Sequence, residues 1–94
     1  MRAGPVAIAL AMLALAGCVR RAALPETGSP AATVYQQRCG QCHAPYNPRT
    51  MTSAMWAVQV DAMQVKMRQS GIPPLTDDQR QTILDYLSRN AGTE

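Results

Sequence analysis

The chain of 94 residues is basic, with a formal charge of +3, and 47% of its residues are hydrophobic. It contains three tyrosines, one tryptophan and no phenylalanine, and its basic residues form no stripe with interleaved aromatic residues. This composition argues against a nucleic-acid partner. A chain this short also buries only a small core by itself.

Residues 1–17 are predicted to be a lipoprotein signal peptide. A positive charge precedes the apolar run Val6–Leu15, which is too short to be a good membrane span. The run ends in Leu15-Ala16-Gly17-Cys18, which resembles a bacterial lipobox. We therefore expect Cys18 to carry a lipid and to become the first residue of the mature protein. The alternatives are an ordinary signal peptide cleaved nearby and an uncleaved anchor.

A lipid on Cys18 would anchor the protein on the periplasmic side of a bacterial membrane. Val19 stands where an aspartate is associated with inner-membrane retention in enteric bacteria, which favours the outer membrane. Residues 18–31 contain two prolines, a glycine and little hydrophobic pattern. They are expected to form the lipidated N-terminus and a tether that spans roughly 20 Å. Residues 32–94 are expected to form the folded domain.

The first helix is predicted over Ala32–Gly40 and leads into the sequence Cys39-Gly40-Gln41-Cys42-His43. This C-x-x-C-H motif is the attachment site of a c-type haem. Two thiols one helical turn apart can add to the two vinyl groups of one porphyrin, and the adjacent imidazole can bind the iron. The sequence therefore predicts one covalent haem c, held by Cys39 and Cys42 with His43 as the proximal ligand.

Two other functions use cysteines at this spacing. A redox dithiol is typical of a thioredoxin-like βαβ unit, but no segment of the sequence shows the alternating pattern of a strand. A structural zinc site needs four ligands, and with Cys18 lipidated only Cys39, Cys42 and His43 remain as a cluster. Because the three cysteines are assigned to lipid and haem, no disulfide is predicted.

A second helix is predicted after a loop over residues 44–50, where proline and asparagine are frequent. It begins at residue 52 or 53, with Ser53 as its N-cap, and it runs to Ser70. Gly71 is expected to end it. Its apolar face is formed by residues at helical spacing: Trp56, Val60, Met63 and Met67.

The last helix is predicted over Asp77–Asn90. Thr76-Asp77-Asp78-Gln79 has the pattern of a capping box, with acidic residues at the positive end of the helix dipole. This helix is expected to bury Ile83, Leu84 and Leu87. The domain is therefore predicted to be all-α, with about three helices.

The order of elements over Ala31–Asn90 resembles class I cytochromes c. The aromatic Tyr35 four residues before Cys39 and the terminal segment Ile83-Leu84-Asp85-Tyr86-Leu87 carry this resemblance together with the motif. It implies a small monohaem fold in which the first and last helices cross near the haem edge. Val34 or Tyr35 would then pack against the terminal segment.

The chain departs from the common class I pattern at two places. Ala31 stands where many relatives carry glycine, and Ser70–Leu75 lacks the methionine of the familiar Met-Pro ligand loop. Trp56 and Met63 on the middle helix are similar to a subgroup that includes small cytochrome subunits of periplasmic dehydrogenases, such as sulfite dehydrogenase. That similarity implies Met63 as the sixth ligand of the iron.

The residues themselves leave the sixth ligand open among four methionines. Met67 lies one turn beyond Met63 on the same face and is the alternative ligand. Met55 is predicted to face away, and the remaining alternatives are Met51, which lies in or near the loop and could swing inward, and an open iron site. A methionine stripe at helical spacing is also a common way to fill a core.

A haem with both axial positions filled has no free site for a substrate, so we expect a one-electron carrier and not an enzyme. Its expected partners are redox proteins such as a dehydrogenase, an oxidase or another cytochrome, together with the membrane through the lipid. Without a methionine on the iron, the protein would be a five-coordinate haem sensor or a haem-containing enzyme subunit. The chain has one histidine, so no distal histidine supports an enzyme.

Overall fold

The computed structural model describes residues 23–93, and it contains no strand within that range. In chain order the elements are α2 (Pro30–Cys39), the short 3-10 helix η1 (Pro48–Thr50), α3 (Ser53–Gln69) and α4 (Asp77–Asn90). The expected all-α domain of three helices is confirmed. The expected signal peptide and Cys18 lie outside the described residues. Within residues 23–93, no helix is long and apolar enough to cross a membrane.

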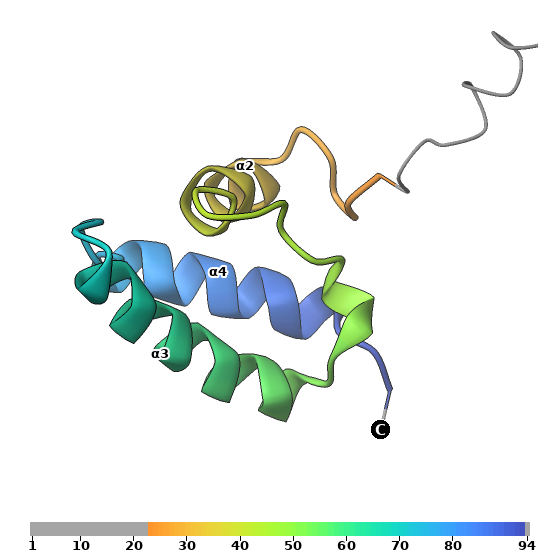
Figure 1. Ribbon diagram of the computed structural model, residues 1–94. Helices are drawn as coiled ribbons and strands as arrows, with labels where there is room; N and C mark the ends of the chain where they lie inside the picture. Colours follow the sequence, from red (N-terminus) through yellow and green to blue (C-terminus); the bar gives the residue numbers. More distant parts are fainter. Residues whose placement is uncertain (1–22, 94) are drawn as a thin grey trace, which may run out of the picture.

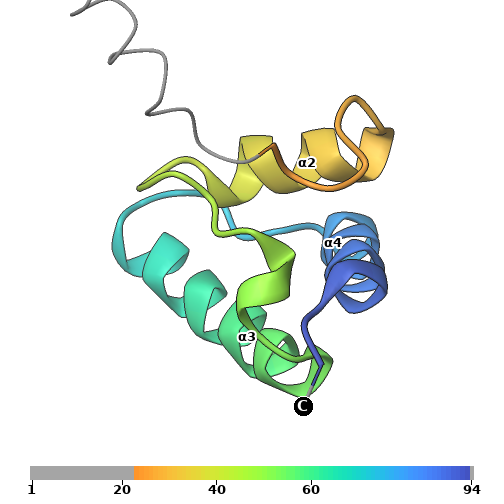
Figure 2. The ribbon, with the colours of Figure 1, turned by 90° about the vertical axis from the view of Figure 1, so that its right-hand side faces the viewer.

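Helix α4 lies between the other two long helices (Figure 1). It crosses α2 steeply and runs beside α3 in the opposite direction (Figures 1 and 2). Helix α4 packs closely against both helices, whereas the backbones of α2 and α3 stay further apart and these two helices meet only through side chains. The candidate site lies where α2 and α3 diverge.

Helix α2 begins two residues earlier than expected. The side chain of Ser29 accepts a hydrogen bond from the backbone N–H of Ala32, and Pro30 occupies the first turn, where a missing N–H costs nothing. The helix ends at Cys39, and the N–H of Gly40 donates to the carbonyl oxygen of Gln36 at 3.0 Å.

Helix α3 is capped by Thr52 and not by the expected Ser53, because the Thr52 side chain accepts the backbone N–H of Met55. Ser53 is instead the first helical residue. The predicted stop at Gly71 is confirmed, since its φ of +72° is one that glycine adopts without strain. The N–H of Ile72 then closes the helix end by donating to the carbonyl oxygen of Met67 at 2.8 Å.

Helix α4 has the predicted bounds and the predicted capping box. The Thr76 hydroxyl accepts the Gln79 N–H, and the Gln79 side chain accepts the Thr76 N–H, each at 3.1 Å. Ile83 and Leu87 are buried as expected, but Leu84 is only partly buried. Tyr86 takes the buried position instead because it faces α2, where its ring centroid lies 5.3 Å from that of Tyr35.

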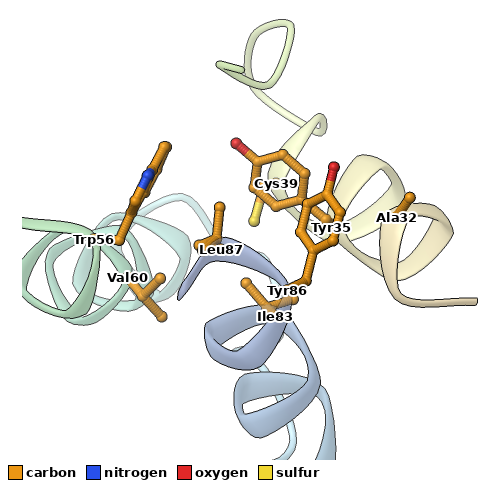
Figure 3. Close-up of a cluster of buried hydrophobic side chains, with 8 residues drawn as sticks. All are labelled: Ala32, Tyr35, Cys39, Trp56, Val60, Ile83, Tyr86 and Leu87. Atoms are coloured by element: carbon orange, nitrogen blue, oxygen red, sulfur yellow. The ribbon is translucent and has the colours of Figure 1, made fainter. Parts of the chain in front are cut away.

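The core is a cluster in which side chains of all three helices converge (Figure 3). The Tyr35 ring lies between Tyr86 on α4 and Trp56 on α3, and its centroid is 6.3 Å from that of Trp56. The expected packing of the first helix on the last through Tyr35 is therefore confirmed. The buried members of the cluster are Ala32, Tyr35, Cys39, Trp56, Val60, Ile83, Tyr86 and Leu87.

The segment that precedes α2 is attached to the far end of α4. Leu24 packs against the core cluster, and the Tyr86 hydroxyl donates to the carbonyl oxygen of Pro25 at 3.0 Å. Glu26 accepts a charged hydrogen bond from Arg89 at 3.1 Å. Residues 24–26 of the expected tether therefore contact the folded domain, and its last two residues belong to α2.

Candidate haem site

A cavity of about 360 Å³ lies between the end of α2 and one face of α3. It brings together the five residues that the sequence assigned to haem attachment and iron ligation, namely Cys39, Cys42, His43, Met63 and Met67. The remaining lining residues are Arg38, Gln41, Gln59, Lys66, Ser70 and Ile72. Met51 and Met55 line a separate groove on the outside of α3, which leaves Met63 and Met67 as the methionines at this site.

The two cysteines of the motif differ in their surroundings. Cys39 is the last residue of α2 and is 8% exposed, whereas Cys42 is exposed on the turn that follows; no disulfide joins the two. Burial raises the pKa of the Cys39 thiol to about 11, against an opposing effect of the neighbouring Arg38 charge. The Cys39 thiol is therefore protonated at neutral pH in this folded arrangement, while Cys42 stays open to solvent.

Gly40 has a structural role that the motif pattern, which leaves this position free, did not reveal. A Cβ atom at this position would collide with the carbonyl oxygen of Gln36. Only glycine therefore lets the chain turn this tightly at the end of α2. The turn returns Cys42 and His43 to the cavity that Cys39 also lines.

The His43 imidazole is exposed at the cavity, next to the Tyr46 ring at a centroid distance of 5.1 Å. Its Nδ1 lies 2.9 Å from the carbonyl oxygen of Ala44. With the proton on Nδ1, the ring donates to this carbonyl and keeps the Nε2 lone pair available. A hydrogen bond from Nδ1–H to a backbone carbonyl oxygen is common for a metal-binding histidine, because it fixes the tautomer and the ring orientation.

The loop that follows His43 is held by side chains of the core. The Tyr35 hydroxyl donates to the carbonyl oxygen of Tyr46 at 2.6 Å, and the Trp56 indole N–H donates to the carbonyl oxygen of Pro48 at 2.7 Å. Because both donors belong to the buried cluster, the position of His43 depends on the packing of α2 and α3. Each of these bonds joins a helix to the loop, so helical periodicity could not predict them.

On the α3 side, Met63 lines the cavity. Gln59 lines the cavity one turn before it, and Met67 one turn after it. Met63 is partly buried and packs against the core cluster, whereas Met67 is 5% exposed. Both thioethers therefore line the same cavity as the motif, and Met63 as the preferred ligand stays a prediction.

Two cationic side chains line the same cavity. Arg38 donates through Nη2 to the carbonyl oxygen of Pro73 at 2.5 Å, and its Nε is buried with no hydrogen-bond partner. Lys66 approaches from α3. A buried donor without a partner is costly, so this pair of cations is suited to an anionic group such as a haem propionate.

The residues present therefore fit a c-type haem: two thiols, an imidazole, thioethers opposite them, and cations for carboxylates. They do not fit the zinc alternative, because residues 23–93 contain no cluster of three His, Cys, Asp or Glu side chains that could hold a metal ion. The dithiol alternative lacks the strands of a βαβ unit within the same range.

Comparison with protein families agrees with this chemistry, because the profile of the dihaem cytochrome c family matches residues 35–94. The chain belongs to the dihaem cytochrome c family. It is therefore a c-type cytochrome with the all-α cytochrome c fold, of a family that uses haem for electron transfer. No curated protein and no solved structure matched the chain.

The family match corrects the expected number of haems. The sequence analysis predicted one covalent haem because it found one C-x-x-C-H motif, whereas the family is defined by two haems. The expectation of a single haem, and with it the monohaem type, is therefore wrong for this family. Counting C-x-x-C-H motifs in this sequence therefore did not give the number of haems that the family match indicates.

Proposed function

We propose that this dihaem-family cytochrome is a periplasmic electron carrier. In this proposal Cys39 and Cys42 would attach haem at the cavity, and His43 and Met63 would bind its iron, with Met67 as the alternative to Met63. The observation that carries it is the single cavity shared by the C-x-x-C-H motif and the methionines of α3. When bound, the haem supplies a centre that accepts and releases one electron.

Side chains that line the cavity would bind the iron and leave it no free position for a substrate. With the proton on Nδ1, His43 would donate to the Ala44 carbonyl oxygen and leave Nε2 free to bind the iron. A thioether from Met63 would be the second protein ligand of the iron and would raise its reduction potential relative to ligation by two histidines. Two protein ligands would leave the iron no free site for a substrate, and this supports an electron carrier over the sensor or enzyme-subunit alternative.

Exposure of the motif supports brief contacts with redox partners. Cys42 and His43 lie at the surface, so one edge of an attached porphyrin would be close to solvent. A small exposed edge suits the low-area interfaces that are typical of redox encounters. We propose a dehydrogenase, an oxidase or another cytochrome as partner.

The same proposal places the domain close to a membrane through a lipid on Cys18. The sequence around Cys18 supports lipidation, and Leu24 and Pro25 are already attached to the core and α4. The chain from Cys18 to Leu24 spans at most about 20 Å when fully extended. The domain would therefore stay near the bilayer on the periplasmic side. Cys18→Ser should release the protein into the soluble periplasmic fraction; a wild-type protein that is already soluble and unlipidated would contradict the anchor.

Carbon monoxide binding tests the electron-carrier proposal. The ferrous protein, matured in a host that produces cytochromes c, is mixed with CO and followed by absorption spectroscopy. We expect a low-spin spectrum, slow or absent CO binding, and reversible one-electron oxidation in a potentiometric titration. A high-spin spectrum with rapid CO binding would instead support the sensor or enzyme alternative.

A further inference from the structure

The positive charge at the cavity is not balanced by an acidic side chain. Arg38 and Lys66 line the cavity, and no aspartate or glutamate of residues 23–93 lines it with them. The two arginines of α4, by contrast, are each paired with a carboxylate, at 3.0 and 3.1 Å. Lys66 is exposed, so water can solvate its charge, whereas Arg38 is only partly exposed. Arg38 is therefore the cation whose surroundings need an explanation.

Two acceptors hold the guanidinium group of Arg38. Its Nη2 donates to the carbonyl oxygen of Pro73 at 2.5 Å, and its Nη1 donates to the side chain of Gln41 at 3.4 Å. Pro73 belongs to the connection between α3 and α4, which passes close to the end of α2 (Figure 2). The guanidinium is thus fixed between the turn after α2 and this connection, and residues of both segments line the cavity.

The Nε–H of Arg38 is the donor that these bonds leave unused. The Nε atom is buried, and no group of residues 23–93 accepts a hydrogen bond from it. A buried donor without a partner costs free energy, and a guanidinium cannot give up its proton to avoid that cost. Because the donors of a guanidinium form a planar fork, the acceptor that fits them best is a planar group with two oxygen atoms, such as a carboxylate.

We propose that Arg38 holds a propionate carboxylate of the haem through Nε, and that the Pro73 carbonyl oxygen positions the guanidinium for this contact. The inference rests on the proposed haem attachment at Cys39, the residue next to Arg38. The two thiols would hold the vinyl groups of the porphyrin, so its carboxylates need a separate group to hold them. Arg38 is then a positioning residue for the haem, whereas the exposed Lys66 adds positive charge without a fixed bond.

A cation at this place also acts on the iron. The ferric haem carries one more positive charge than the ferrous haem, so a nearby guanidinium disfavours the ferric state and raises the reduction potential. Loss of Arg38 should therefore lower the potential. It should also remove a hydrogen bond from the carboxylate, and a vibrational spectrum detects that loss independently of the charge.

Arg38→Gln in the haem-loaded full chain tests the contact, because glutamine is polar but has neither the charge nor the Nε donor. The propionate bending band of the resonance Raman spectrum, which responds to hydrogen bonds at the carboxylate, should shift. At a fixed potential, the ratio of oxidised to reduced protein should rise about tenfold, which corresponds to about 59 mV for one electron.

Arg68→Gln is the matched control. It removes the same charge from an exposed position of α3 that does not line the cavity, and it should leave both the band and the potential unchanged. Arg38→Lys separates charge from geometry, because lysine restores the charge but not the planar fork. It should recover part of the potential while the Raman band stays shifted.

An unchanged Raman band in Arg38→Gln would overturn the proposal, because water and not a carboxylate would then be the partner of Nε. An equal fall in potential in Arg68→Gln would also overturn it, since the effect would be one of net charge. If Arg38→Gln does not retain haem, the band of Arg38→Lys decides in the same way: a wild-type band overturns the proposal, and a shifted band supports it.

The pyridine haemochrome spectrum of the wild-type protein separates this inference from the proposed function. Wild-type protein with covalent haem, together with a band that does not respond to substitution of Arg38, contradicts only the role of Arg38. Wild-type protein without covalent haem contradicts the proposed function itself.

Discussion

The crossing of α2 and α4 and the space between α2 and α3 involve the same helices but are filled differently. At the crossing, Ile83, Tyr86 and Leu87 are fully buried among protein atoms. Between α2 and α3 there is a cavity of about 360 Å³ that Cys42 and His43 line from the exposed side. The crossing is therefore filled by protein side chains, whereas the cavity is where the proposed haem would bind. Substitutions at the crossing should change stability, and substitutions at the cavity should change the haem.

The largest effect on stability is expected at the crossing. Ile83→Ala removes a side chain with 0% exposure and should lower the free energy of unfolding of the haem-loaded protein by about 2–5 kcal/mol. The spectrum of the folded fraction should not change, because Ile83 does not line the cavity. Guanidinium unfolding followed by absorbance measures both. Ser88→Ala, at an exposed position of the same helix, is the control. A spectral change in Ile83→Ala would contradict the claim that the crossing affects only stability.

The clearest effect on the haem is expected at Met63. Met63→Ala should abolish the long-wavelength charge-transfer band of ferric His/Met haem and lower the reduction potential, because the thioether ligand is lost. Met67→Ala should keep the band and lose stability, since Met67 is 5% exposed. If the band survives in Met63→Ala and disappears in Met67→Ala, Met67 is the ligand.

A smaller effect that links the two regions is expected at Trp56. Trp56→Phe keeps an aromatic ring but removes the indole N–H that donates to the buried Pro48 carbonyl oxygen at 2.7 Å. Leaving this acceptor unpaired should cost about 1–3 kcal/mol, and the loop behind His43 should loosen. The spectrum of the iron should then become more sensitive to added imidazole. Tyr46→Phe changes the same loop without removing a bond to its backbone, and an equal loss in that variant would argue against the role of the indole.

The smallest effect is expected at the far end of α4, away from the cavity. Hydrogen bonds from Arg89 and Asn90 hold the pKa of the Glu26 carboxyl below its ordinary value of 4.5. The folded state therefore binds this proton less well than the unfolded chain. The stabilising effect is present at neutral pH and is lost as the pH falls through 4.5 and below. Glu26→Gln should lower the melting temperature slightly at pH 7 and flatten its decline in acid; an unchanged acid profile would show that the contact has no effect.

Local signals predicted most of the fold correctly. Gly71 and the pair Thr76 and Gln79 determine helix ends through bonds within a few residues, so the boundaries could be derived from the sequence. The start of α2 was placed late because Ser29 lies in a segment whose composition is typical of a tether. The attachment of Pro25 to Tyr86 spans 61 residues, and no local pattern contains such a contact.

Sequence reasoning could propose only those residues of the candidate site whose spacing is fixed by covalent chemistry or by the period of a helix. The motif identified Cys39, Cys42 and His43, and the helical period brought Met63 and Met67 to the same wall. The role of Gly40, by contrast, depends on how closely the chain passes the Gln36 carbonyl. The number of haems was predicted wrongly because it was derived from a single C-x-x-C-H motif, whereas the matched family is a dihaem family.

The central claim is that the cavity between α2 and α3 holds haem attached to Cys39 and Cys42. Mass spectrometry of tryptic peptides, after extraction with acidified acetone, tests it most directly. Cleavage after Arg38 and Arg49 releases a peptide that contains both cysteines and His43. We predict that this peptide carries haem and that neither cysteine reacts with iodoacetamide. A peptide with two alkylated cysteines and no haem, from protein matured in a cytochrome c-producing host, would contradict the account.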